Sequence, residues 1–180
     1  MGNRRFFYVS IVLSISLFLC PSLWAKSFIN EEKNYSFQYD ESIFTLVYPG
    51  FLTTDLVLHR KDAESGFFPN LTITSKVIDS AFNLDEEVAR TRAEASKIFP
   101  GIEWVRAEPL IFKGEPAYFF ELKYQRDNHL LFLRAFLIRA PRRFMSLSIT
   151  TPVETAASHL AAFMPVIDSL EIHHVPSATP

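Results

Sequence analysis

The feature that most constrains the fold is a strand-length segment, residues 130–139, that is apolar on both of its faces. Alternate side chains of an extended chain point to opposite sides of a sheet. One side carries Leu130, Phe132, Phe136 and Ile138, and the other carries Leu131, Leu133, Ala135 and Leu137. A strand that is apolar on both sides is covered on both sides. We therefore predict that this segment lies at the centre of a sheet, with packing layers above and below it.

Other segments alternate between apolar and polar residues and are separated by turn residues, which predicts further strands. These segments are residues 35–39, 54–60, 70–78, 102–112, 117–125 and 144–150. Short turns between successive strands favour antiparallel pairing. Pro109 interrupts its segment, which is typical of an edge strand or a bulge.

Two helices are predicted from their start signals. Asn83 precedes an apolar stripe at helical spacing, with Glu86 placed as its capping-box partner. Thr151 is predicted to cap the second helix, with Pro152 at its first position and Glu154 completing the box. The pattern as a whole predicts an α+β fold, in which an antiparallel sheet of about six to seven strands lies between helices.

The amino terminus has the layout of a secretory signal peptide. Arg4 and Arg5 precede an apolar run over residues 6–20, and Ala25 offers a small residue for cleavage before Lys26. The run of about 15 residues is shorter than the roughly 20 that a membrane-spanning helix needs. We predict a signal peptide over residues 1–25, a flexible lead-in over 26–33, one domain over 34–173 and a disordered tail over 174–180. The mature protein would then be periplasmic or secreted.

Three alternatives to an ordinary signal peptide remain open. The leader could stay uncleaved as an anchor. Residues 3–7 resemble a twin-arginine signal. Cys20 has Leu17 at the −3 position of a lipoprotein site, although Leu19 at −1 and Pro21 at +1 argue against lipidation.

Cleavage before Lys26 would remove Arg4, Arg5 and the single cysteine. The mature chain would keep 16 Lys and Arg against 20 Asp and Glu, a formal net charge of −4. A mildly acidic protein lacks the basic footprint that nucleic-acid binding requires. Without cysteine it has neither disulfides nor thiolate chemistry.

Four features together resemble the PsbP-like superfamily, which includes the extrinsic photosystem subunit of that name and DcrB-type envelope lipoproteins. They are the opening segment 35–39, the capped helix after Asn83, the hairpin entry 114–118 and the closing segment 163–170. Residues 40–44 depart from the Pro-x-x-Trp sequence frequent in the family. The resemblance implies an antiparallel sheet between helices and a non-enzymatic accessory role, often beside a membrane complex. It transfers no functional residue.

The motifs of common catalytic and cofactor sites are not found in the sequence. The histidines, which are His59, His129, His159, His173 and His174, do not follow zinc-ligand spacings. There is no G-x-S-x-G motif, and five glycines in the whole chain do not supply a phosphate-binding loop. We therefore predict no catalytic residue, metal, nucleotide or cofactor.

Two features suggest partner contacts. Phe67 and Phe68 lie in a predicted loop, and exposed aromatic residues tend to mark binding sites; the alternative is that their rings pack into the core. If they form a contact, removing both should weaken partner binding with little loss of stability. Arg139, Arg142 and Arg143 cluster near one hairpin end and would suit lipid headgroups or an acidic partner; the alternative is a solvated turn.

The leading functional hypothesis is an exported accessory or binding protein of the bacterial envelope that acts through its surface on a protein or membrane complex. The alternatives are a periplasmic enzyme whose site is assembled from scattered residues and a structural subunit of an envelope complex.

Overall fold

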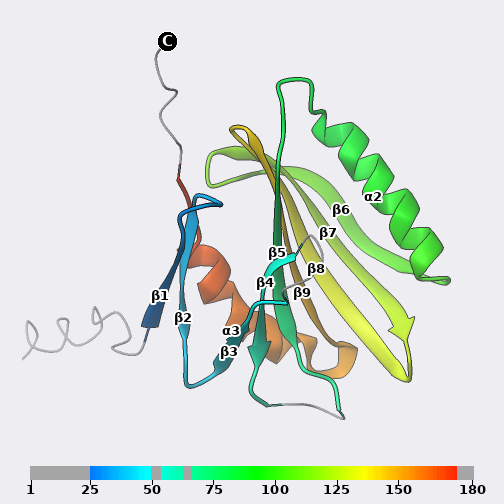
Figure 1. Ribbon diagram of the computed structural model, residues 1–180. Helices are drawn as coiled ribbons and strands as arrows, with labels where there is room; N and C mark the ends of the chain where they lie inside the picture. Colours follow the sequence, from blue (N-terminus) through cyan, green and yellow to red (C-terminus); the bar gives the residue numbers. More distant parts are fainter. Residues whose placement is uncertain (1–24, 50–53, 63–65, 174–180) are drawn as a thin grey trace, which may run out of the picture.

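The computed structural model describes residues 25–49, 54–62 and 66–173, which form two antiparallel sheets and two helices (Figure 1). The small sheet consists of β1 (Ala25–Asn30), β2 (Tyr35–Asp40) and β10 (Glu171–Ile172). The large sheet consists of β3 (Phe44–Val47), β4 (Thr54–Arg60), β5 (Asn70–Val77), β6 (Glu103–Phe112), β7 (Glu115–Arg126), β8 (His129–Ala140) and β9 (Arg143–Pro152). The helices are α2 (Leu84–Ile98) and α3 (Ala156–Ser169), and a short 3₁₀ turn, Val153–Thr155, precedes α3.

The large sheet has seven strands in the order β3-β4-β5-β9-β8-β7-β6. Strand β9 is its middle strand and β8 lies directly beside it. Phe136 and Ile138 of β8 are buried on one face, and Leu131 and Leu137 are buried on the other. The prediction that residues 130–139 form an interior strand covered on both sides is therefore confirmed, one strand away from the exact centre.

Strand β6 is an edge strand of the large sheet, as Pro109 predicted. Its pairing with β7 is irregular between Trp104 and Arg106, so the bulge lies several residues before the proline. Proline is tolerated on an edge strand because one side of such a strand has no neighbour, and a missing N–H on that side costs no hydrogen bond of the sheet.

One face of the large sheet is covered by α3 together with β2 (Figure 1). Phe163 and Ile167 of α3 are fully buried against Leu147 and Ile149 of β9 in a single apolar cluster, which Phe37 of β2 also joins. Burying a side chain of this size stabilises the fold by about 1.5–3 kcal/mol. This cluster is the main core of the protein.

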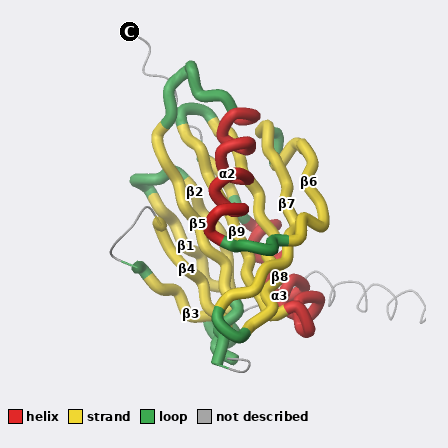
Figure 2. Tube along the Cα trace, turned by 90° about the vertical axis from the view of Figure 1, so that its right-hand side faces the viewer, coloured by secondary structure: helices red, strands yellow, loops and turns green. Residues whose placement is uncertain are grey.

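The other face carries α2, which crosses it as Figure 2 shows. Val88 of α2 packs with Phe120, Leu137 and Phe144 from β7, β8 and β9. Asn83 caps this helix as predicted, because its Oδ1 accepts hydrogen bonds from the N–H groups of Asp85 (2.9 Å) and Glu86 (3.3 Å). The fold is thus helix, sheet, helix, with the small sheet added beside α3.

The start of α3 differs from its prediction. Thr151 and Pro152 continue β9, where they pair with Phe132 and Leu131 of β8, and the Thr151 hydroxyl donates to the Pro152 carbonyl. The helix begins at Ala156, after the 3₁₀ turn, and Thr155 caps it without a side-chain hydrogen bond. Sheet pairing across the hairpin overrides a capping signal that is purely local.

The lead-in also differs from its prediction. Most of the segment expected to be flexible is ordered as β1, which pairs with β2 from Ala25 opposite Asp40 to Asn30 opposite Tyr35. The predicted signal peptide up to residue 24, including Cys20, and the tail from residue 174 lie outside the described residues. Among the residues that are described, no helix is both long and apolar enough to cross a membrane.

Candidate functional site

The two predicted contact features lie at opposite ends of the large sheet (Figure 1). Phe67 and Phe68 belong to the β4–β5 connection, at the same end as the turn between β7 and β8. The three arginines lie around the β8–β9 turn, at the end where β5 leads into α2. They therefore do not form one surface.

Phe67 is half-buried and acts as the anchor of its loop. Its ring packs against the apolar cluster of Leu122, Tyr124 and Leu131, and it lies 5.9 Å from the His129 ring, measured between centroids. For Phe67 the alternative interpretation from the sequence is correct, since this ring joins the core.

Phe68 leaves 48% of its surface exposed. The Asn70 side chain donates a hydrogen bond to the Phe68 carbonyl (3.0 Å), and the Phe68 ring lies against His59 of β4. Burial lowers the pKa of His59 below its usual value, and its Nδ1 is buried without a hydrogen-bond partner among the described residues. The ring of Phe68 is thus presented on a supported loop.

Further apolar side chains are exposed at this same end of the sheet. Ile43 lies beside the β4–β5 connection, because its carbonyl accepts the N–H of Lys61 (3.0 Å), and Leu130 follows His129 at the start of β8. Both are partly exposed, as Phe68 is. We call Ile43, Phe68 and Leu130, with Phe67 as their anchor, the aromatic end of the protein.

The three arginines separate onto different surfaces. Arg143 is engaged on the α3 side: it donates to the Ser75 hydroxyl (3.1 Å) and to the Glu32 carbonyl (3.3 Å), while Ser75 donates to Asp55 (2.6 Å). These bonds tie the β1–β2 turn to the large sheet. Arg143 therefore has a structural role, because its side chain is used to hold this turn.

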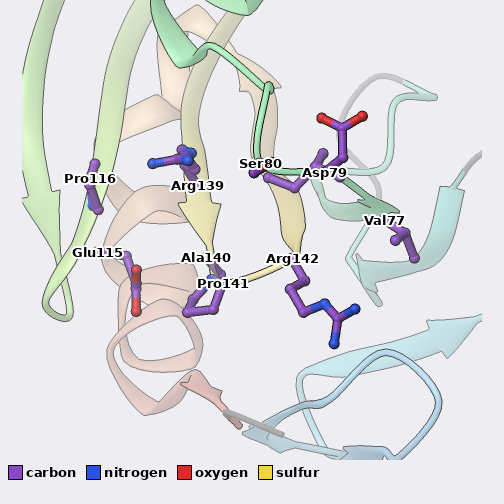
Figure 3. Close-up of a pocket in the computed structure, with 10 residues that line it drawn as sticks. Val77, Asp79, Ser80, Glu115, Pro116, Arg139, Ala140, Pro141 and Arg142 are labelled. Carbon is purple, nitrogen blue, oxygen red and sulfur yellow. The ribbon is translucent and has the colours of Figure 1, made fainter. Parts of the chain in front are cut away.

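Arg139 and Arg142 both line a cavity of about 800 Å³ at this end of the sheet (Figure 3). The cavity lies between the β8–β9 turn, the β6–β7 turn and the β5–α2 connection. Arg142 is exposed on the turn at a positive φ of 58°. The Arg139 guanidinium reaches from β8 towards Pro116, whereas the Arg142 side chain points elsewhere.

The sequence did not indicate that Val77, Asp79 and Ser80 would complete this cavity. Val77 is the last residue of β5, within the segment predicted as a strand, and Asp79 and Ser80 lie in the connection to the helix after Asn83. No local signal identifies which hairpins such a connection meets, because that depends on the order of strands in the sheet.

The described residues contain no group of three or more His, Cys, Asp or Glu side chains arranged to hold a metal ion. His59, His129 and His159 lie on different elements, β4, β8 and α3. His159 is buried within its helix, and His173 lies beside β2, where its ring contacts the Ser36 hydroxyl (2.9 Å).

Comparison of the whole fold with solved structures places it among α+β sandwiches of one type. The structure of cyanobacterial PsbP (CyanoP) from Synechocystis sp. PCC 6803 matches with a TM-score of 0.63 at 15% identity, over 86% of this chain and 97% of that one. LpqN, described as involved in cell envelope biogenesis of Mycobacterium tuberculosis, matches with a TM-score of 0.65 at 9% identity, over 83% and 92%. The Ran-binding protein Mog1p of Saccharomyces cerevisiae matches at 0.53 and 9% identity, over 82% and 95%.

No family model and no curated protein matches the sequence. These three structural matches nevertheless cover 92–97% of each of the three neighbours. The chain has the PsbP-like fold, and the resemblance seen in the sequence is confirmed at the level of the fold. At identities this low the comparison transfers the architecture and no site residue.

Proposed function

We propose that this protein is an exported, non-enzymatic accessory protein of the bacterial envelope that binds a protein partner through its aromatic end. The observation that carries the proposal is the difference in burial between two adjacent phenylalanines. Phe67 packs against the apolar cluster, whereas the ring of Phe68 is about half exposed. An exposed aromatic ring with apolar neighbours suits a protein interface, where Tyr, Trp and Phe are enriched relative to the rest of the surface.

The fold neighbours support a binding role by analogy. Mog1p is described as a Ran-binding protein and LpqN as a protein of cell envelope biogenesis. Those descriptions belong to the two neighbours. The description of Mog1p supports a partner-binding role for this architecture, and the sequence of this chain adds a leader typical of export.

The binding proposal is tested by affinity capture from envelope extracts, comparing the wild-type protein with Phe68→Ser. The control is Val105→Ser, which removes an apolar side chain of similar exposure, 47% against 48% for Phe68, from the edge strand β6. We expect a stoichiometric partner that is retained by wild type and by the Val105 variant and is lost from the Phe68 variant. Equal retention by all three would show that the aromatic end is not the interface.

Export is tested separately, by the amino-terminal sequence of the protein recovered from the periplasm. The proposed cleavage before Lys26 leaves almost all of β1, because Lys26 pairs with Tyr39 inside the strand. We expect a mature chain that begins at Lys26. Recovery of the intact chain from the cytosol would contradict the proposal.

A further inference from the structure

Arg139 lies where two cavities meet. It comes from the end of β8 and pairs with Phe144 across the ladder, which places it on the face that carries α2. One is the cavity of about 800 Å³ that Arg142 also lines, and the second, of about 500 Å³, lies beside the start of α2. Both cavities are lined by Arg139 and Pro116.

The guanidinium of Arg139 has an unused donor. Its Nε is buried, yet it has no hydrogen-bond partner among the described residues, and no ion pair within them includes Arg139. Buried donors in native proteins are almost always satisfied, by the protein itself, by water or by a ligand. An arginine offers a planar fork of N–H groups whose preferred acceptor is an oxyanion.

The surroundings of Arg139 are largely apolar on the side of the second cavity. Figure 3 shows its guanidinium directed towards Pro116, which begins that wall. The apolar residues that line the second cavity are Phe82, Leu84, Pro109, Leu110, Ile111, Ala117 and Tyr118. Ile111 is 68% exposed, so this wall is open to an incoming molecule. A ligand that reached Arg139 would have an apolar surface beside it.

The charges around Arg139 restrict how much negative charge the ligand carries. Arg142 lines the first cavity, but so do Asp79 and Glu115, and Asp85 lines the second. Asp79 already accepts the N–H of Ala81 (2.9 Å). These carboxylates oppose a doubly charged phosphate more strongly than a singly charged carboxylate.

We infer that Arg139 marks a binding site for an organic monocarboxylate with an apolar chain, such as a medium-length fatty acid. The carboxylate lies on the Arg139 guanidinium, and the chain runs past Pro116 along the wall that includes Ile111. The site is at the opposite end of the sheet from Phe68. The proposal of a carboxylate site therefore does not depend on the proposal of a partner interface.

The test is titration calorimetry of the purified full chain with sodium decanoate, with decanol, acetate and inorganic phosphate as comparison probes. Every variant is compared with wild type, so that binding by other segments cancels. We expect saturable binding of decanoate, weakened at least tenfold by Arg139→Gln. The matched control is Arg126→Gln, which removes a well-exposed arginine at the other end of the sheet and should change nothing.

A second variant, Ile111→Ser, tests the chain-binding wall without touching a buried residue. It should weaken decanoate binding several-fold and leave acetate binding unchanged. If Arg139→Gln does not fold, this variant alone tests whether decanoate binds at the site. Wild-type affinity in both variants would overturn the site. Decanol that binds as tightly as decanoate would overturn the role of Arg139, and phosphate that binds as tightly would reduce the site to a general oxyanion site.

Discussion

The rings of His59 and Phe68 meet nearly at right angles, with centroids 6.2 Å apart and planes inclined by 79°. His59 belongs to β4 and Phe68 to the connection that follows it. The contact therefore joins the end of the β4–β5 connection back to the strand from which the connection starts. This pair links the exposed ring of the aromatic end to a partly buried titratable group.

We predict that Phe68→Ala raises the pKa of His59 towards its ordinary value of 6.5. The cause of the lowered pKa is burial, and removing the ring opens the imidazole to water. The measurement is an NMR pH titration of the histidine ring signals in both proteins. An unchanged His59 pKa in the variant would show that other groups shield the imidazole.

The same lowered pKa predicts a pH dependence of folding stability. The unfolded chain takes up the His59 proton at a higher pH than the folded chain does, so the free energy of unfolding falls as the pH drops below about 6.5. Above that pH the contribution is fully present. Denaturation midpoints measured between pH 7.5 and pH 5 should fall less in His59→Gln than in wild type, and parallel curves would argue against the assignment.

Phe67 and Phe68 should respond differently to truncation. Phe67→Ala removes a half-buried ring from the apolar cluster and should cost about 1–3 kcal/mol, whereas Phe68→Ala should cost less than about 1 kcal/mol. The packing of Phe67 also changes the expectation for the double variant, which should lose stability as well as binding. Chemical denaturation of the two single variants measures the difference, and equal losses would contradict the assigned roles.

Asn83→Ala should destabilise the protein by about 1 kcal/mol, because the N–H groups of Asp85 and Glu86 lose their acceptor at the start of α2. Asn83→Asp keeps a side-chain oxygen there and serves as the control. Thermal unfolding should show a lower melting temperature for the alanine variant alone. A loss of equal size in both variants would indicate a role other than capping.

The ion pair between Arg134 and Glu121 should be worth more than the exposed pairs. Arg134 donates two hydrogen bonds to Glu121 Oε1 (2.9 and 2.5 Å), and both side chains are largely buried beneath α3 near Met164. Glu121→Ala leaves the guanidinium without its acceptor and should cost about 1–3 kcal/mol.

Glu103→Ala is the matched control for that pair. It breaks the more exposed contact with Lys123 on the neighbouring strand pair and should change stability by less than about 0.5 kcal/mol. Urea denaturation of both variants makes the comparison. Equal effects would mean that burial adds nothing to the Arg134–Glu121 pair.

Local patterns predicted the parts of the fold that depend on local physics. The alternation over residues 130–139 identified β8 as an interior strand, and Asn83 identified the start of α2. Thr151 shows where such reasoning fails, because its capping signal lost to pairing with Phe132 across the β8–β9 hairpin. The contact residues show the same limit, since Phe67 and Phe68 are chemically alike and only the packing of the loop assigns one inward and one outward.

The amino-acid sequence alone determined most of the long strands, the start of α2 and which strand needs cover on both faces, because side-chain alternation and caps act within a few residues; it did not predict β1, β3 or β10. The tertiary structure decided what supplies that cover. The small sheet joins β2 to segments near both ends of the described chain, and the Gln38 N–H donates to Ser169, 131 residues away (2.8 Å). It also decided that Arg139 and Arg143 lie on opposite faces, because the β8–β9 turn sets the register. Contacts of this range follow from the packing of whole layers, which no short stretch of sequence encodes.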